Sequence, residues 1–341
     1  VLGTVIATAE IAWYRRKQRQ NSPPLSSLAQ GAAVMTGVTA LATAEGWTAD
    51  VVAGLIKTRA PGFAGLAEPI GHLVALAPLV GGAWAAVEYV YRATENGGSA
   101  VEQAYQRPPT SPGASGGPAS QVSWDTLGRE GRRFVNMLLP AKEITAVTGL
   151  PARDPVRVFV GLASAPTVDA RVALAMDELE ALGAFDRKVL CLASPTGTGY
   201  VNYVVAETLE YLTEGDCATV ALQYSLRPSF LSLDRVALGR EQNRALLHAI
   251  NGRLRAIPED RRPRFVGLGE SLGAFTLQDA FLHEGTAGLH RAGMTRALFI
   301  GTPAESKWAE QWRLDPGRWD PDGEVVEVAS EEEWLALPEQ E

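Results

Sequence analysis

A serine flanked by glycines, in the pentapeptide Gly-Glu-Ser-Leu-Gly at residues 269–273, is the part of the sequence that most directly indicates chemistry. An apolar run typical of a buried parallel strand precedes it, and a pattern typical of a helix follows it. A serine on such a turn exposes its hydroxyl as a nucleophile, and glycines two positions away on each side let the two backbones approach. We therefore predict that Ser271 is a catalytic nucleophile and that Gly269, Glu270 and Gly273 form its turn. A plain glycine and serine turn is the alternative.

Attack by a serine on a carbonyl carbon also requires hydrogen-bond donors for the negative oxygen of the tetrahedral intermediate. The backbone N–H of Leu272, at the start of the following helix, is the first expected donor. The strand two before the serine's own strand is followed by a glycine-rich turn at 194–200, and a donor from this loop is expected in the same arrangement. We predict Thr196 and Gly197 for this role. A tight strand-to-helix turn is the alternative, and the loop at 161–164 is the fallback.

Alternating apolar runs and amphipathic segments surround these turns. Such alternation predicts an α/β fold, with a mostly parallel sheet and helices on both faces. We expect strands at 156–162, 188–192, 218–224, 265–268 and 297–300, helices at 169–182, 201–212 and 239–255, and a last strand-like run at 324–328. The serine turn then lies at the edge where the parallel strands end.

Composition divides the chain into three parts. Residues 1–93 are apolar, and we expect them to form a helical, transmembrane region. Residues 94–123 are rich in Pro, Gly and Ser, which predicts a flexible linker. Residues 124–341 contain the alternating pattern and form the expected catalytic domain.

Three apolar segments in the N-terminal region are candidate membrane spans, at 1–14, 28–44 and 70–90. A basic cluster at 15–19 follows the first segment, as is typical of the cytoplasmic end of a span. Three spans would place the catalytic domain on the cytoplasmic side, and two would place it outside. Apolar helices of a soluble domain are the alternative.

The net charge of −8 over 341 residues argues against a nucleic-acid partner, because no basic stripe is present. Cys191 and Cys217 lie in apolar runs and are expected to be buried, without a disulfide or a metal. We expect no cofactor. Three tryptophans after the last predicted sheet strand would line an acyl pocket or pack within a cap: Trp308, Trp312 and Trp319. The sequence gives no indication of oligomeric state.

Six segments carry a resemblance to a known family. They are GREGRRFV at 128–135, VFVGL at 158–162, LGAFDRKVLC at 182–191, PTGTG at 195–199, ALQYS at 221–225 and GESLG at 269–273. With them, the chain from residue 126 onward resembles a bacterial α/β-hydrolase family in which several N-terminal transmembrane helices precede a catalytic domain. The resemblance implies a serine triad in a membrane-anchored hydrolase.

The histidines depart from the order that such a triad requires, which is serine, then acid, then histidine along the chain. The sequence has four histidines, His72, His248, His283 and His290, and none follows the acids after the strand at 297–300. His290 and His248 are the remaining candidates for a base, although a surface or structural role is the main interpretation of each. We expect the catalytic domain to be incomplete at its C-terminus, with the acid and base beyond residue 341.

Three functions follow from these features. The favoured one is a membrane-anchored serine hydrolase of the esterase or lipase type, in which Ser271 attacks an apolar, lipid-like acyl ester. The second is a catalytically inactive hydrolase fold that acts as a binding module. The third is an acyltransferase that uses the same serine with an acceptor other than water.

Overall fold

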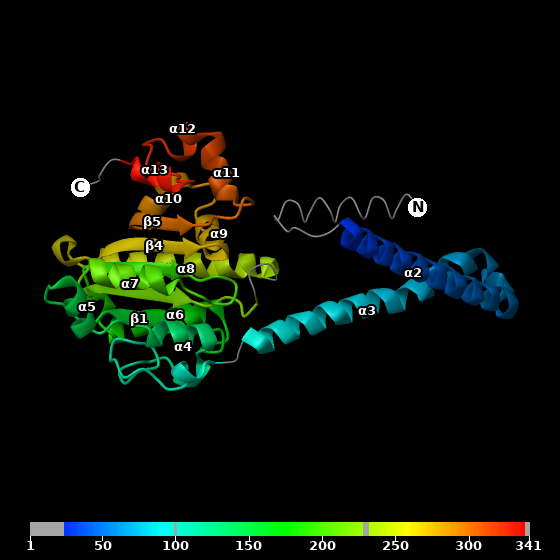
Figure 1. Cartoon of the computed structure of the whole chain (residues 1–341), viewed down its shortest axis with the longest axis horizontal. Helices are drawn as coiled ribbons and strands as arrows, with labels where there is room; N and C mark the ends of the chain where they lie inside the picture. The colour runs from blue at the N-terminus through cyan, green and yellow to red at the C-terminus, as the bar shows by residue number, and fades with distance from the viewer. Residues whose placement is uncertain (1–23, 99–100, 228–231, 338–341) are drawn as a thin grey trace. The chain divides into compact units, whose positions relative to one another are not determined.

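The structure is a computed structural model that describes residues 24–98, 101–227 and 232–337. The chain divides between Val90 and Tyr91 into two compact units, which we describe separately (Figure 1). The first predicted membrane span, at 1–14, lies outside the described residues.

The N-terminal unit contains helix α2 (Pro24–Arg59), a short 3-10 helix η1 (Pro61–Leu66) and the start of helix α3 (Ala67–Gly98). The two long helices approach closely where Gly71 faces the backbone of Ala49, since a Cβ at Gly71 would lie 2.4 Å from the Ala49 carbonyl oxygen. Glu45 and His72 form an ion pair between the same helices, with 2.7 Å between Oε1 and Nδ1. A second ion pair joins Lys57 of α2 to Glu68 of α3, with 3.0 Å between Nζ and Oε1. Small side chains and these two polar pairs therefore join the helical hairpin.

Most large apolar side chains of this unit are exposed. Trp47 and Trp84 are each 69% exposed, and Leu73 is 71% exposed. The predicted spans at 28–44 and 70–90 fall within α2 and α3. Among the described residues, one stretch, Pro61–Gly82, is long and apolar enough to cross a membrane by length and composition. Several membrane spans therefore stay a prediction.

The second unit is built on five parallel strands in the order β1-β3-β2-β4-β5 (Figure 1). Their bounds are β1 (Val156–Val160), β2 (Val189–Ser194), β3 (Cys217–Leu222), β4 (Arg264–Glu270) and β5 (Met294–Ile300). The strands β1 and β3 are buried along their whole length, as apolar runs in a parallel sheet require. The predicted α/β class is confirmed.

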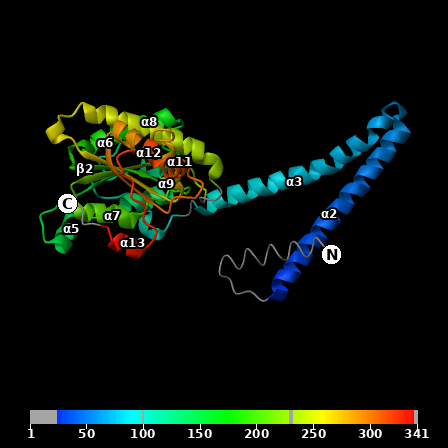
Figure 2. The same ribbon diagram turned by 90° about the horizontal axis from the view of Figure 1, so that it is seen from above.

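Helices cover both faces of this sheet. Helices α6, α7 and α8 connect β1 to β2, β2 to β3 and β3 to β4. The chain crosses the sheet in one direction through α6 and α8 and in the opposite direction through α7. Because such crossovers are right-handed, α7 lies on the face opposite α6 and α8 (Figure 2). The covering helices are α4 (Arg129–Asn136), α5 (Ala141–Thr148), α6 (Val168–Ala181), α7 (Tyr203–Leu212), α8 (Val236–Arg255) and α9 (Leu272–Asp279). Helices α10 (Gly285–Arg291), α11 (Lys307–Leu314), α12 (Pro316–Trp319) and α13 (Glu331–Leu335) follow.

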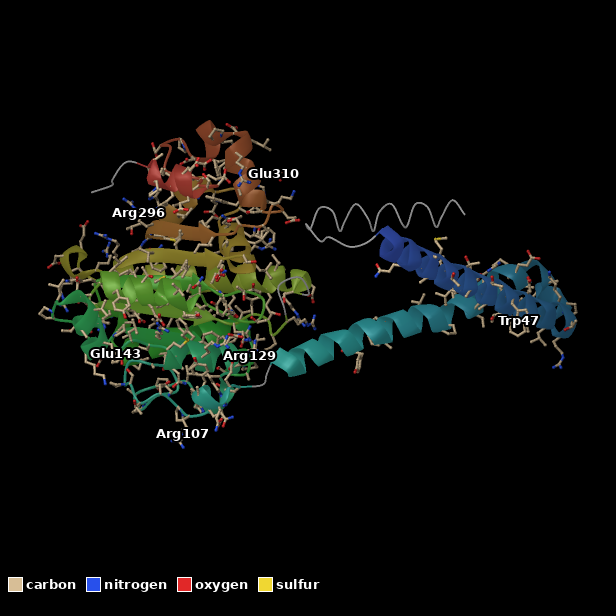
Figure 3. The ribbon with its side chains drawn as sticks, viewed as in Figure 1. Trp47, Arg107, Arg129, Glu143, Arg296 and Glu310 are labelled. Carbon is tan, nitrogen blue, oxygen red and sulfur yellow. The ribbon has the colours of Figure 1, made fainter. Side chains whose placement is uncertain are left out.

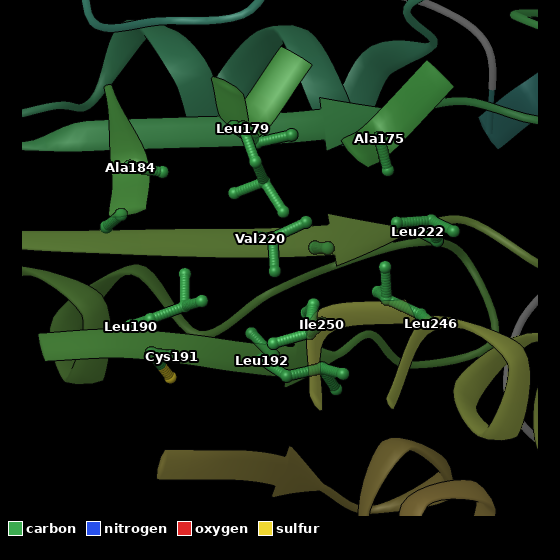
Figure 4. Close-up of a cluster of buried hydrophobic side chains, with 14 of the residues drawn as sticks. Ala175, Leu179, Ala184, Leu190, Cys191, Leu192, Val220, Leu222, Leu246 and Ile250 are labelled. Carbon is green, nitrogen blue, oxygen red and sulfur yellow. The ribbon is translucent and has the colours of Figure 1, made fainter. Parts of the chain in front are cut away.

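The main core lies between the sheet and the pair α6 and α8 (Figure 4). Leu179 of α6, Val220 of β3 and Ile250 of α8 are each 0% exposed there. Burial of one such side chain stabilises a fold by about 1.5–3 kcal/mol, so this layer fixes the sheet on which the serine turn stands.

The predicted flexible linker at 94–123 is wrong for its second half. The Arg157 N–H of β1 donates to the Gly113 carbonyl at 2.8 Å, and the Ser115 N–H donates to the Arg157 carbonyl at 3.0 Å. Ala114 and Ser115 are fully buried. The segment therefore runs beside the edge strand β1.

A buried carboxylate holds the rest of this segment. Glu178 of α6, 0% exposed, accepts hydrogen bonds from the hydroxyls of Ser115 at 2.8 Å and Ser120 at 2.6 Å, and from the Gln121 N–H at 2.5 Å. Pro, Gly and Ser indicate backbone freedom in an isolated chain, but three donors on one buried acceptor fix a single conformation here.

The predicted strand at 324–328 is also wrong. The carboxylate of Asp320 accepts the N–H groups of Glu324 at 2.9 Å and Val325 at 3.0 Å, so the first donors of this segment do not form a strand ladder. The segment instead forms one wall of a 720 Å³ cleft beside the edge strand β5.

Candidate active site

Ser271 occupies the junction between β4 and α9, at the edge where the strands end. Its backbone has φ of +52° and ψ of −120°, a combination that L-residues rarely adopt. The Ser271 N–H donates to the Ile300 carbonyl at the end of β5, at 2.8 Å. This bond and the packing of the turn hold the residue in its strained conformation, with the side chain partly exposed.

The two glycines of the pentapeptide are needed for close backbone contacts. A Cβ on Gly269 would lie 2.7 Å from the Ala274 Cα, and a Cβ on Gly273 would lie 2.2 Å from the Ser194 carbonyl oxygen. Atoms cannot approach at these distances, so each position requires glycine. The first glycine lets the helix turn back over its strand, and the second lets it rest against the end of β2.

The backbone N–H of Leu272 is the donor best placed by the fold to bind an oxyanion. Leu272 is the first residue of α9, and N–H groups in the first turn of a helix have no intrahelical acceptor. The donor therefore lies directly beside the Ser271 hydroxyl, at the positive end of the short helix.

The loop at 195–200 also lies beside the serine turn. Strand β2 pairs with β4, and Ser194 is opposite Gly269. However, the Thr196 N–H donates to the Tyr200 carbonyl at 2.9 Å, so it closes the loop instead of facing the serine. The Thr196 N–H is therefore engaged within the loop, and a role of Thr196 in oxyanion binding stays a prediction. Gly197 lies in the same loop and stays a prediction.

The candidate bases are not brought to Ser271. His290 is on α10, which precedes the start of β5 and so lies at the opposite edge of the sheet, and its Nε2 is 2.6 Å from Oε2 of Glu324. His248 is exposed midway along α8. His283 follows α9, and its Nδ1 is 2.7 Å from Nε2 of Gln311.

Acidic and phenolic groups gather near the serine instead. Burial raises the pKa of the Tyr200 phenol, and the negative charges of Glu270 and Glu130 raise it further. Oε2 of Glu270 is buried and has no hydrogen-bond partner within the described parts of the chain. Tyr200 therefore stays protonated and can donate a hydrogen bond. No sequence motif marks this residue.

The arginines at the start of α4 are ion-paired. Oε1 of Glu130, a buried side chain, lies 2.6 Å from Nη2 of Arg129, and its Oε2 lies 3.3 Å from Nη1 of Arg133. Arg129 lies on the side of the sheet toward which the strands point (Figure 3). Glu130 and Glu102, which also pairs with Arg133, balance the charges of Arg129 and Arg133, so these two arginines supply little net positive charge to the site.

The cysteines do not form a metal site or a disulfide. Cys191 and Cys217 are free and buried. In the ranges that the structure describes, no group of three or more His, Cys, Asp or Glu side chains is arranged to hold a metal ion.

A parallel sheet with a serine at a strained strand-to-helix turn defines the class of α/β-hydrolase folds. Residues 156–338 match the family described as "Alpha/beta-hydrolase family", and residues 10–137 match "Alpha/beta-hydrolase family N-terminus". The first match covers more than half of the chain, which therefore belongs to the α/β-hydrolase family. No curated protein and no solved structure matches the chain.

Proposed function

We propose that the chain is a serine hydrolase in which Ser271 is the nucleophile. The observation that carries this proposal is the positive φ of Ser271 between two glycines that no larger residue can replace. A non-glycine residue in such a conformation costs about 1–3 kcal/mol, and this strain is typical of functional sites. The family to which the chain belongs supports the same assignment.

In the proposed reaction, Ser271 Oγ attacks the carbonyl carbon of an ester. The carbonyl oxygen becomes negative and accepts a hydrogen bond from the Leu272 N–H, with Gly197 as the proposed second donor. The alcohol then leaves, and water hydrolyses the acyl-enzyme to release the acid and free Ser271. A general base takes the Ser271 proton and gives it to the departing alcohol, and in the second step it takes a proton from the attacking water.

We further propose an apolar, lipid-like acyl substrate and a membrane anchor of several helices within residues 1–93, with 124–341 as the catalytic domain on the cytoplasmic side. The exposed Trp47, Leu73 and Trp84 support this part of the proposal. Large apolar side chains at the surface are a feature of helices that contact lipid. Residues 10–137 match the model described as the N-terminus of this family, so the proposed anchor falls in a region that the family model includes.

Covalent labelling of the full chain with a fluorophosphonate tests the proposal. We expect labelling of the wild-type chain and none of Ser271→Ala. Ser330→Ala, at the N-cap of α13, is the matched control and should label like the wild type. Equal labelling of Ser271→Ala would contradict the assignment, and an unlabelled wild type would favour a binding module without catalysis.

A further inference from the structure

A buried glutamine lies at the edge where the strands end, directly after β3. Gln223 directly follows β3 and is 2% exposed. Its N–H donates to the Val160 carbonyl at the end of β1, at 2.9 Å. Its side-chain amide points the other way, toward the loop after β2, where Nε2 donates to the Thr198 carbonyl at 2.9 Å.

The loop is shaped around this amide. Gly199 has φ of +92°, and a Cβ there would lie only 2.5 Å from Nε2 of Gln223. Glycine therefore meets two needs at this position, the left-handed backbone and the space for the amide. On its other side, the same loop rests on α9, where the Pro195 carbonyl oxygen lies 2.9 Å from an ideal Cβ on Gly273. The loop is thus held between Gln223 and the serine turn.

Gln223 is itself held by a chain of buried polar side chains. Gln242 of α8, 1% exposed, donates from Nε2 to the Gln223 carbonyl at 3.3 Å. Arg171 of α6, 4% exposed, donates from Nε to Oε1 of Gln242 at 2.9 Å. Arg171 also donates from Nη1 to the Ala165 carbonyl at 3.1 Å. A charge-assisted bond at one end of such a chain restrains every member that follows.

We propose that Gln223 is a positioning residue for the Ser271 site. Its amide holds the loop at 195–200 against the serine turn, and Arg171 and Gln242 hold Gln223. The inference rests on the proposed function, in which that loop contributes to oxyanion binding. The Thr196 N–H bonds to the Tyr200 carbonyl within the loop. The loop therefore keeps its place through the bond from the Gln223 side-chain amide to the Thr198 carbonyl and not through a bond to the serine.

Two variants remove the donor without changing the size of the side chain, Gln223→Met and Gln223→Glu. Each leaves the Thr198 carbonyl without its partner, and either one suffices if the other does not fold. The matched control is Gln311→Met, which removes a partly buried amide on α11 that contacts His283. All four full-length chains are compared by amide hydrogen exchange of residues 196–200 and by the kinetics of fluorophosphonate labelling.

We expect exchange in the loop to accelerate about 10-fold in both Gln223 variants and to stay unchanged in the control. We also expect the maximal labelling rate to fall about 10- to 100-fold with little change in the half-saturating probe concentration, since a misplaced element slows the reaction more than it weakens binding. A change in stability alone would not produce that split.

The two measurements separate the two proposals. Unchanged exchange in both Gln223 variants would overturn the positioning role, whatever the labelling shows. Faster exchange with unchanged labelling would also overturn it, because the loop would then be irrelevant to the serine. A wild-type chain that does not label would contradict the proposed function, and exchange alone would then decide whether Gln223 holds the loop.

Discussion

At the scale of single residues, the strained backbone conformation of Ser271 depends on the absence of a Cβ at Gly269 and Gly273. The strained turn persists because Gly269 and Gly273 let three backbone segments approach to distances that a methyl group would prevent. The sequence alone predicts the turn because those two glycines are visible in it. The sequence does not show that Gly273 meets the backbone of Ser194, because that partner is set by the order of strands in the sheet.

Gly273→Ala should destabilise the fold by about 1–3 kcal/mol and abolish labelling of Ser271, because the new methyl overlaps the Ser194 carbonyl at 2.2 Å. The matched control is Gly252→Ala on the exposed side of α8, where no atom lies within 4 Å. The control should be stabilised by about 0.5–1 kcal/mol through helix propensity. Urea denaturation of both variants measures the difference, and equal stabilities would contradict the close contact.

The two buried thiols make a prediction about pH. Burial raises the pKa of Cys191 and of Cys217 from 9.0 to about 12. The folded state therefore favours the neutral thiols, and the stability they contribute is present below about pH 9 and lost as the pH rises toward about 12. Neither thiol should react with a disulfide reagent at pH 8 until urea is added, and stability should fall above pH 9. Rapid reaction of the native chain would be evidence against this burial.

At the scale of elements, the strands of the sheet could be predicted from the sequence, but the segments that lie beside its two edge strands could not. Continuous apolar runs place the strands β1 to β4 within a few residues, because strands that are mostly buried leave a local signal. The edge strand β5 is mostly exposed or half-buried, and its apolar run at 297–300 marks only its second half. The ordered conformation of the segment at 113–122 could not be predicted from its own sequence, because that conformation depends on Glu178, which lies far along the chain. The run at 324–328 has strand propensity, but Asp320 takes its first donors.

The same distinction applies to the candidate site. The serine and its first donor follow from a local motif, but Gln223, Tyr200 and Glu130 come from three separate segments of the chain. A single glutamine after a strand carries no pattern that distinguishes it from a surface residue. Only the pairing of β3 with both β1 and β2 brings its amide to the loop.

At the scale of the whole molecule, the two compact units predict separate behaviour. Residues 101–341, produced alone, should unfold cooperatively and keep the reactivity of Ser271, because the sheet and its core lie within that unit.

Residues 1–98 should partition into the membrane fraction and be released by detergent but not by high salt, because apolar burial is insensitive to screening. Recovery of residues 1–98 in the soluble fraction would contradict a membrane anchor.

The strand order also determines how the chain can fold. Strand β1 does not pair with the next strand along the chain, since its neighbour β3 comes only after α6, β2 and α7. No hairpin can start the sheet, because every neighbouring pair is parallel. During synthesis β1 therefore has no neighbouring strand until β3 has been added, although the segment at 113–115 can already contact it, and the loss of chain entropy precedes most of the stabilising contacts. Slow folding and a period of exposure to chaperones follow from this order.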